Sequence, residues 1–205
     1  MALFQSCLGV VLAGGKSSRM GENKANLLRE NQDMLSYSKS LLNAVGSSQV
    51  IVSGGEQGIK DLVADMGPLG GIQSIIEQFK PQALLILPID LPLMTSNELL
   101  ALKQVGELSQ QACYFTDHYL PLYLPVNAFV EQFFQQPLSV MKPKVATQKA
   151  QGNRNLSGPS VRSLLAQVPH KVITPKNSQC LFNTNTPEQW QQAKQLLSLQ
   201  RKSHV

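Results

Sequence analysis

The sequence predicts an α/β fold, in which short buried strands alternate with helices. Two runs rich in leucine, valine and isoleucine lie at residues 8–13 and 83–93, and they end at glycines and at an aspartate. Such runs are typical of strands buried in a parallel sheet. A polar stretch at residues 29–33 predicts a turn, and residues 34–45 carry apolar side chains at helical spacing before the stop signal Gly46.

The composition is that of a globular protein with one domain. With 205 residues the chain can bury a substantial core, and its 42% apolar and 15% charged residues exclude a disordered chain. The net charge of +5 and the pI of about 9.2 do not come from a basic run, because the cations are spread along the sequence. Composition therefore predicts no nucleic-acid partner.

The cysteines and the first residues favour a cytoplasmic protein. Cys7, Cys113 and Cys180 are odd in number and widely spaced, without a CxxC pair, which favours a reducing compartment. The opening stretch MALFQSC lacks a basic n-region, and no apolar run approaches the length of a membrane span. We expect a cytoplasmic protein that does not enter a membrane.

A glycine-rich loop follows the first predicted strand. Two glycines open it, cations follow, and no acid lies between residues 9 and 21. Glycines let backbone N–H groups close on phosphate oxygens without Cβ atoms in the way. Arg19 offers bidentate contact to phosphate, and Lys24 offers a mobile point charge. The loop therefore predicts a nucleotide phosphate site, formed by Gly14, Gly15, Lys16, Ser17, Arg19 and Lys24.

Two other interpretations of this loop stay open. Paired glycines often form only a tight connection between a strand and a helix. The sequence Gly15-Lys16-Ser17 also imitates the end of the P-loop motif G-x-x-x-x-G-K-[ST]. That motif requires a glycine at position 10, where this chain has Val10. However, Asp90 follows a predicted strand, as the Walker B aspartate of a P-loop protein would, so this alternative stays open.

Two more loops are candidates for binding the base or the ribose. A predicted strand at residues 50–52 runs into Ser53 and two further glycines. Residues 65–72 combine a proline with three glycines, so the backbone can lie flat against a ring. The structural alternatives are a turn after Ser53 and the first turn of a helix over residues 72–79. The candidates of the second loop are Asp65, Pro68, Leu69, Gly70 and Gly71.

Asp90 closes the most strand-like run of the chain, in the sequence Asp-Leu-Pro. Ligands of open α/β sheets gather at the carboxyl ends of strands. A carboxylate there suits Mg²⁺, which takes few protein ligands and keeps several waters. The alternative is an aspartate that caps a helix or a turn. The neighbouring candidate loops favour the metal.

The second half of the chain shows fewer signals. We expect a helix over residues 95–105, an extended segment over 112–124 and helical spacing over 157–168. A polar segment with several lysines at 135–158 is either a basic loop over a phosphorylated acceptor or a disordered excursion. His118 is left out of the candidate site, since a lone histidine among aromatic residues usually packs or lies at the surface.

Two asparagines near the C-terminus form the last candidate. Asn183 and Asn185 are two residues apart, so they point the same way if the backbone is extended. Each offers a donor and an acceptor, a combination that suits a heterocycle such as a pterin. The same stretch predicts the start of a helix over 188–199, with Thr186 as N-cap and Pro187 at the first position. Both interpretations can hold together.

Four of these elements resemble, in the same order, the motifs of molybdenum cofactor guanylyltransferases. Residues 12–24 are similar to L-A-G-G-x-x-x-R-M-G-x-D-K, and residues 67–71 are similar to G-P-L-[AG]-G. The sequence Asp-Leu-Pro at Asp90 resembles the metal-binding D-x-P of this superfamily. Residues 180–188 resemble F-x-N-[IV]-N-T-P-E/D. The resemblance covers almost the whole chain.

The resemblance implies a single domain over residues 1–205, with a three-layer α/β/α Rossmann-like fold of the glycosyltransferase-A type and a mostly parallel central sheet. Residues 1–95 would form the nucleotide-binding half and residues 96–205 the acceptor-binding half. The implied reaction transfers GMP from GTP to the molybdopterin cofactor, releases pyrophosphate and uses Mg²⁺ or Mn²⁺. Molybdoenzyme apoproteins or other cofactor-biosynthesis proteins are implied as further partners.

The resemblance also implies roles for individual residues. Arg19, Lys24 and Asp90 are the catalytic residues, and Asp90 binds the metal. Asn183 and Asn185 bind the acceptor. The implied nucleotide-binding residues are Leu12, Ala13, Gly14, Gly15, Lys16, Ser17, Lys24, Ser53, Asp65, Pro68, Leu69, Gly70, Gly71 and Asp90.

Departures from the family pattern keep alternatives open. Asn23 stands where the family usually has an acid, the match around Ser53 is thin, and Thr184 stands in an apolar place. One alternative is a member that binds GTP or cofactor without turnover. The other is a different nucleotidyltransferase, either a molybdopterin cytidylyltransferase or an enzyme that acts on a sugar phosphate.

Overall fold

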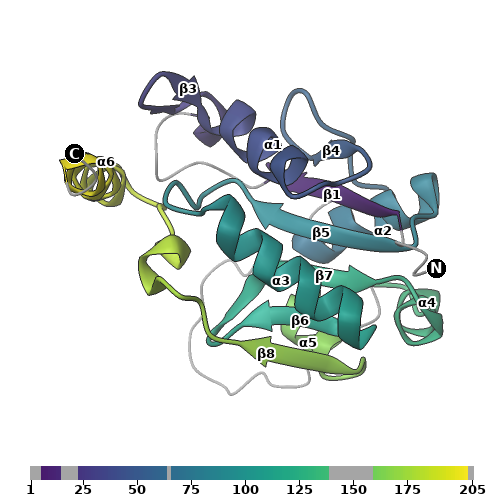
Figure 1. Ribbon diagram of the computed structural model, residues 1–205. Coiled ribbons are helices and arrows are strands. Elements are labelled where there is room, and N and C mark those ends of the chain that lie inside the picture. The colour runs from purple at the N-terminus through teal and green to yellow at the C-terminus, as the bar shows by residue number, and fades with distance from the viewer. Residues whose placement is uncertain (1–5, 15–22, 64–65, 139–158, 203–205) are drawn as a thin grey trace, which may run out of the picture.

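The protein, seen in a computed structural model, is described over residues 6–14, 23–63, 66–138 and 159–202. Within these ranges six strands form one sheet in the order β4-β1-β5-β7-β6-β8 (Figure 1). They are β1 Cys7–Leu12, β4 Val50–Ser53, β5 Ala83–Pro88, β6 Ala112–Phe115, β7 His118–Pro125 and β8 His170–Ile173. β1 pairs in parallel with β4 and β5, β8 pairs in parallel with β6, and β7 runs antiparallel between β5 and β6. The predicted mostly parallel sheet is confirmed.

Helices cover both faces of the sheet and complete three layers (Figure 1). α1 Met34–Ala44 and α3 Ser96–Ser109 cover one face, and α2 Pro68–Phe79, α4 Ala128–Gln135 and α5 Val161–Leu165 cover the other, whereas α6 Pro187–Lys202 lies beside the sheet. Successive side chains of a strand point to opposite faces. Accordingly, Leu85 of β5 packs in one hydrophobic cluster with α1 and α3, whereas Leu84 and Ile86 pack in another with α2, α4 and α5. The predicted three-layer α/β/α fold is confirmed.

Short elements connect these layers. β2 Leu28–Arg29 and β3 Gln32–Asp33 pair as a small hairpin, which confirms the turn predicted for this stretch. Single turns of 3₁₀ helix occupy Lys24–Asn26 and Ser178–Leu181. Within the described ranges, no helix combines the length and the apolar composition needed to cross a membrane.

The predicted helices occur, but several of their bounds differ, and α3 for example ends at Ser109 instead of residue 105. The helix predicted over residues 72–79 already begins at Pro68, because a proline at the first position is preorganised for a helix and Gly67 turns the chain before it with a φ of 61°. The helical spacing predicted over 157–168 yields only α5. Most of the polar segment at 135–158 lies outside the described residues.

The three cysteines are buried and form no disulfide. Burial raises the pKa of the Cys7 and Cys180 thiols to about 12, and that of the Cys113 thiol to about 11. Because the thiolate is the reactive form, we expect none of them to react with a chromogenic disulfide reagent at about pH 8 in the native protein. All three should react after unfolding in guanidinium chloride. Rapid labelling of the native protein would contradict this burial.

Candidate active site

A pocket opens at the carboxyl ends of β1 and β5, where ligands of α/β sheets usually bind. It has a volume of about 350 Å³ and takes its walls from segments far apart in the sequence. Residues from both halves of the chain meet here. The lining residues are Leu12, Ala13, Gly14, Lys24, Pro68, Pro88, Ile89, Asp90, Leu91, His118, Leu120, Asn183 and Asn185.

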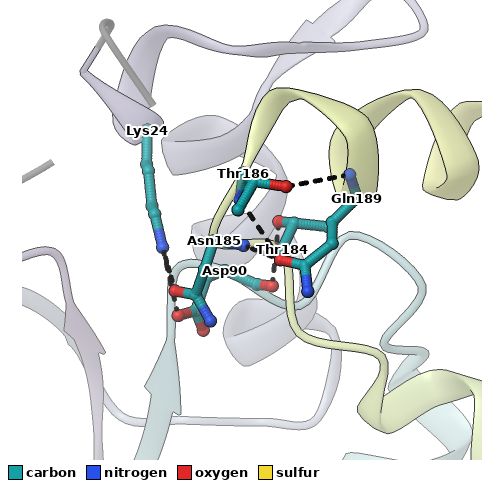
Figure 2. Close-up of polar contacts among 6 residues, drawn as sticks. All are labelled: Lys24, Asp90, Thr184, Asn185, Thr186 and Gln189. Atoms are coloured by element: carbon teal, nitrogen blue, oxygen red, sulfur yellow. Dashed lines mark hydrogen bonds and ion pairs between the residues drawn. The ribbon is translucent and has the colours of Figure 1, made fainter. Parts of the chain in front are cut away.

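Lys24, Asp90 and Asn185 form the polar centre of this pocket (Figure 2). The Lys24 ammonium lies 3.4 Å from Asp90 Oδ2 and donates a hydrogen bond of 2.8 Å to Asn185 Oδ1. The side chains of Lys24 and Asp90 are only 17% and 19% exposed. One cation thus connects the predicted metal carboxylate with a predicted acceptor residue.

The second carboxylate oxygen of Asp90 fits a divalent metal. Asp90 Oδ1 is buried and has no hydrogen-bond partner among the described residues. A buried acceptor without a partner costs free energy, and a bound cation would remove that cost. The described ranges hold no group of three or more His, Cys, Asp or Glu residues able to hold a metal. A single carboxylate suits Mg²⁺ that takes its other ligands from phosphates and water.

The backbone around Asp90 is tied to two other parts of the site. The N–H of Ile89 donates to the carbonyl of Leu12 at 3.1 Å, which joins the exits of β5 and β1. The Asp90 carbonyl accepts two hydrogen bonds from Thr184, one from its N–H at 2.9 Å and one from its hydroxyl at 3.2 Å (Figure 2). Thr184 is almost fully buried. The buried hydroxyl of Thr184 is therefore hydrogen-bonded, although the family motif has an aliphatic residue at this position.

The asparagine pair and the helix start both occur in the structure, as the sequence predicted. Asn183 and Asn185 flank the buried Thr184, and both line the pocket. The hydroxyl of Thr186 accepts from the N–H of Gln189 at 3.3 Å, and Gln189 Oε1 accepts from the N–H groups of Asn185 and Thr186 at 2.7 and 3.2 Å (Figure 2). This is a capping box, which fixes the asparagine segment to the start of α6.

The described part of the glycine-rich loop lies against the exit of β4. The N–H of Ala13 donates to the carbonyl of Ser53 at 2.9 Å, and Gly14 lines the pocket. Gly54 packs so closely on Gly14 that a Cβ at Gly54 would lie 2.6 Å from the Gly14 Cα, and its φ is 74°. The other predicted phosphate ligands, Gly15, Lys16, Ser17 and Arg19, lie outside the described residues.

Asn23, which replaces the usual acid, has a structural role. Its side-chain oxygen accepts a hydrogen bond of 3.0 Å from the N–H of Ala25, so it caps the 3₁₀ turn Lys24–Asn26. Asparagine and aspartate are comparable N-caps. The replacement therefore leaves the turn that carries Lys24 capped.

The predicted base-binding residues are only partly at the pocket. Pro68 lines it, whereas Leu69 is fully buried and Gly70 and Gly71 lie inside the first turns of α2. Ser53 is also buried, and its Oγ lies so close to Gly71 that a Cβ there would be 2.1 Å from it. These residues pack β4 against α2. Asp65 lies outside the described residues.

Sequence reasoning did not select several residues that the structure places at or near the site, such as Pro88, Ile89 and Leu91 beside Asp90. His118 and Leu120 line the pocket, because β7 runs antiparallel to β5 and so begins beside the β5 exit. Asp61 precedes α2 in the chain, and its side chain packs against the first turns of that helix, with carboxylate oxygens 3.1 and 3.4 Å from Cβ positions built on Gly70 and Gly71. Burial raises the pKa of Asp61. No local motif marks His118, Leu120 or Asp61.

Together, the fold and the pocket define a three-layer α/β protein with a polar pocket at the carboxyl edge of its sheet, where such proteins bind their ligands. Residues 9–172 match the family model of the MobA-like NTP transferase domain. The chain is 35% identical over 200 residues to the molybdenum cofactor guanylyltransferase of Xanthomonas euvesicatoria pv. vesicatoria, an alignment that covers 93% of this chain and 95% of the relative. The chain therefore belongs to the MobA-like NTP transferase family, and the P-loop alternative is set aside.

Solved structures share the fold. A molybdopterin-guanine dinucleotide biosynthesis protein A from Archaeoglobus fulgidus superposes with a TM-score of 0.67 at 17% identity, covering 93% of this chain and 98% of that one. A protein of Mycobacterium tuberculosis H37Rv, solved as a complex with manganese, superposes with a TM-score of 0.58 at 15% identity and the same coverage. At these identities the similarity establishes the fold alone.

Proposed function

We propose that the protein is a molybdenum cofactor guanylyltransferase, which transfers GMP from GTP to molybdopterin cofactor and releases pyrophosphate. The observation that carries this proposal is the contact of Lys24 with both Asp90 and Asn185 in one pocket. Lys24 and Asp90 belong to the nucleotide motifs, and Asn185 belongs to the acceptor motif. The name of the Xanthomonas relative, at 35% identity over 93% of the chain, supports this choice of reaction.

In the proposed reaction, a phosphate oxygen of the acceptor attacks the α-phosphorus of GTP. A new P–O bond forms, the bond to the bridging α–β oxygen breaks, and pyrophosphate leaves with the electron pair. The attacking phosphate is already an anion, so no general base is needed. Positioning and electrostatic stabilisation therefore supply most of the rate.

The residues divide this work between two halves of the chain, which we propose as residues 1–95 for the nucleotide and 96–205 for the acceptor. Gly14 lets the backbone approach the phosphates, and the Lys24 ammonium balances their charge. Arg19 and Lys16 take similar roles in the proposal, on the strength of their motif. Asp90 would hold Mg²⁺ or Mn²⁺, which would neutralise charge on the triphosphate; the manganese complex of the Mycobacterium structure is consistent with this.

We also propose that the reaction takes place in the cytoplasm. The three thiols without disulfides suit a reducing compartment. The product would pass to molybdoenzyme apoproteins or to other cofactor-biosynthesis proteins.

The acceptor role of Asn183 predicts a selective defect. In Asn183→Ala, the KM for molybdopterin should rise about tenfold, since up to two hydrogen bonds of about 1 kcal/mol each are lost. The KM for GTP should change by less than about twofold, because the hydrogen bonds of the Lys24 ammonium go to Asp90 and Asn185 and not to Asn183. Asn43→Ala, at an exposed position of α1, is the matched control. A rise in the KM for GTP alone would assign Asn183 to the nucleotide instead.

Nucleotide selectivity tests the proposed donor. Thermal unfolding should shift upward with GTP and Mg²⁺ but much less with CTP, UTP or dTTP, because a ligand stabilises the state that binds it. Stabilisation by CTP alone would replace the guanylyl proposal by a cytidylyl one. Stabilisation by GTP without any transfer to the cofactor would favour a member that binds but does not turn over.

A further inference from the structure

The turn that follows Asp90 is held by side chains from distant parts of the chain. The carbonyl of Pro92 accepts a hydrogen bond of 2.7 Å from Arg29 Nε, and the carbonyl of Met94 accepts one of 2.5 Å from the hydroxyl of Tyr37. Thr184 bonds the carbonyl of Asp90 itself. The main-chain carbonyls of Asp90, Pro92 and Met94 therefore each accept a hydrogen bond from a residue outside the turn.

Arg29 and Tyr37 act as one unit. The Arg29 guanidinium carbon lies 3.8 Å from the centroid of the Tyr37 ring, which is a cation–π contact. Arg29 also pairs with Glu30 at 3.2 Å, and its side chain is only 16% exposed. Burial raises the pKa of Tyr37, so its hydroxyl remains a protonated donor at neutral pH. The ring orients the guanidinium, and each partner donates to its own carbonyl.

The turn depends on such donors because its own sequence supplies few. Pro92 has no N–H to donate, and the N–H of Met94 is used within the turn on the carbonyl of Leu91 at 3.2 Å. The next residue, Thr95, is already engaged as the N-cap of α3. Without outside donors, the segment would be held by the burial of Leu91, Leu93 and Met94, and such apolar packing is not directional and does not by itself fix the carbonyls.

We propose that Arg29 and Tyr37 are a positioning pair, which holds the carboxylate of Asp90 where a metal-bound nucleotide needs it. The inference rests on the proposed function, and it adds residues that neither the family motifs nor the pocket contains. Neither side chain lines the pocket, so both act through the backbone of the turn. Outer-shell partners of a metal ligand commonly change metal affinity or activity by about 10- to 100-fold when they are replaced.

The test compares Arg29→Met, Tyr37→Phe and Lys194→Met, which removes an exposed cation of α6 and matches the charge change of the first variant. Binding of Mn²⁺ in the presence of GTP, followed by electron paramagnetic resonance, is measured beside kcat and urea unfolding. We expect Arg29→Met to weaken Mn²⁺ binding and lower kcat about tenfold. Tyr37→Phe should change both in the same direction by a smaller factor, and Lys194→Met should leave both unchanged.

The outcomes separate this inference from the proposed function. If both variants are only less stable, and Mn²⁺ binding and kcat of the folded protein are unchanged, Arg29 and Tyr37 stabilise the fold without positioning Asp90. That result would overturn the proposal. Tyr37→Phe, which loses one hydroxyl, keeps the test open if Arg29→Met does not fold. If the wild-type protein makes no guanine dinucleotide but Arg29→Met still weakens Mn²⁺ binding, the proposed function fails and the positioning role stands.

Discussion

Asp90→Asn should reduce transfer of GMP to the molybdopterin cofactor by at least about a thousandfold. The charge stabilisation supplied by a metal ion is worth several kcal/mol, and each 1.4 kcal/mol corresponds to about a factor of ten. Asparagine keeps the size of the side chain but removes the negative charge that the metal needs. The same change leaves the Lys24 ammonium without its carboxylate partner.

The variant should nevertheless fold. Thr184 donates both of its hydrogen bonds to the main-chain carbonyl of Asp90, and these survive the substitution. The measurement is kcat/KM for GTP, together with urea unfolding of both proteins. Glu131→Gln, at an exposed position of α4, is a matched control that should retain full activity. If Asp90→Asn is as active as the wild type, the metal lies elsewhere.

Lys24→Met should lower kcat/KM for GTP by about a hundredfold or more. Removing one preorganised donor from a charged reaction centre commonly costs about 10²- to 10³-fold. Methionine keeps most of the length of the lysine side chain but loses its charge. Because the pair is mostly buried, loss of the ammonium leaves the Asp90 carboxylate with less compensation, and the free energy of unfolding should fall by about 1 to 3 kcal/mol.

Lys24→Met also tests whether binding of one substrate changes the affinity of the protein for the other. Asp90 and Asn185 engage two of the three donors of the ammonium, which leaves one for a phosphate oxygen, so the bound nucleotide and the acceptor residue Asn185 would share one cation (Figure 2). In the wild type, bound GTP should therefore change the affinity for the acceptor, and this coupling should vanish in Lys24→Met. Lys194→Met is again the control. Equal coupling in both variants would show that Lys24 does not connect the sites.

The sequence was most informative where the signal is local. Apolar runs that end at Gly14 and Asp90 predicted β1 and β5. The alternation of Asn183 and Asn185 predicted that their side chains point the same way, and both line the pocket. These features depend on neighbouring residues only. The capping signal at Thr186 was equally local, and the structure confirms it.

Contacts between distant segments could not be predicted in the same way. Lys24 and Asn185 are 161 positions apart, and Arg29 and Pro92 are 63 apart, so no spacing relates them. His118 reaches the pocket only because β7 is antiparallel to β5, and the sequence did not determine that direction. The start of α2 was placed too late because the glycines after Pro68 are typical of a loop, whereas burial of Leu69 stabilises the helix.

The most direct test of the proposed reaction is product analysis by mass spectrometry. The purified protein is incubated with Mg²⁺ and either GTP or CTP, with and without molybdopterin cofactor, and Asp90→Asn serves as the inactive control. We predict that molybdopterin guanine dinucleotide and pyrophosphate form in equal amounts, and only when GTP and the cofactor are both present. Tight binding of GTP without any dinucleotide, or transfer from CTP in preference to GTP, would contradict the proposed guanylyltransferase.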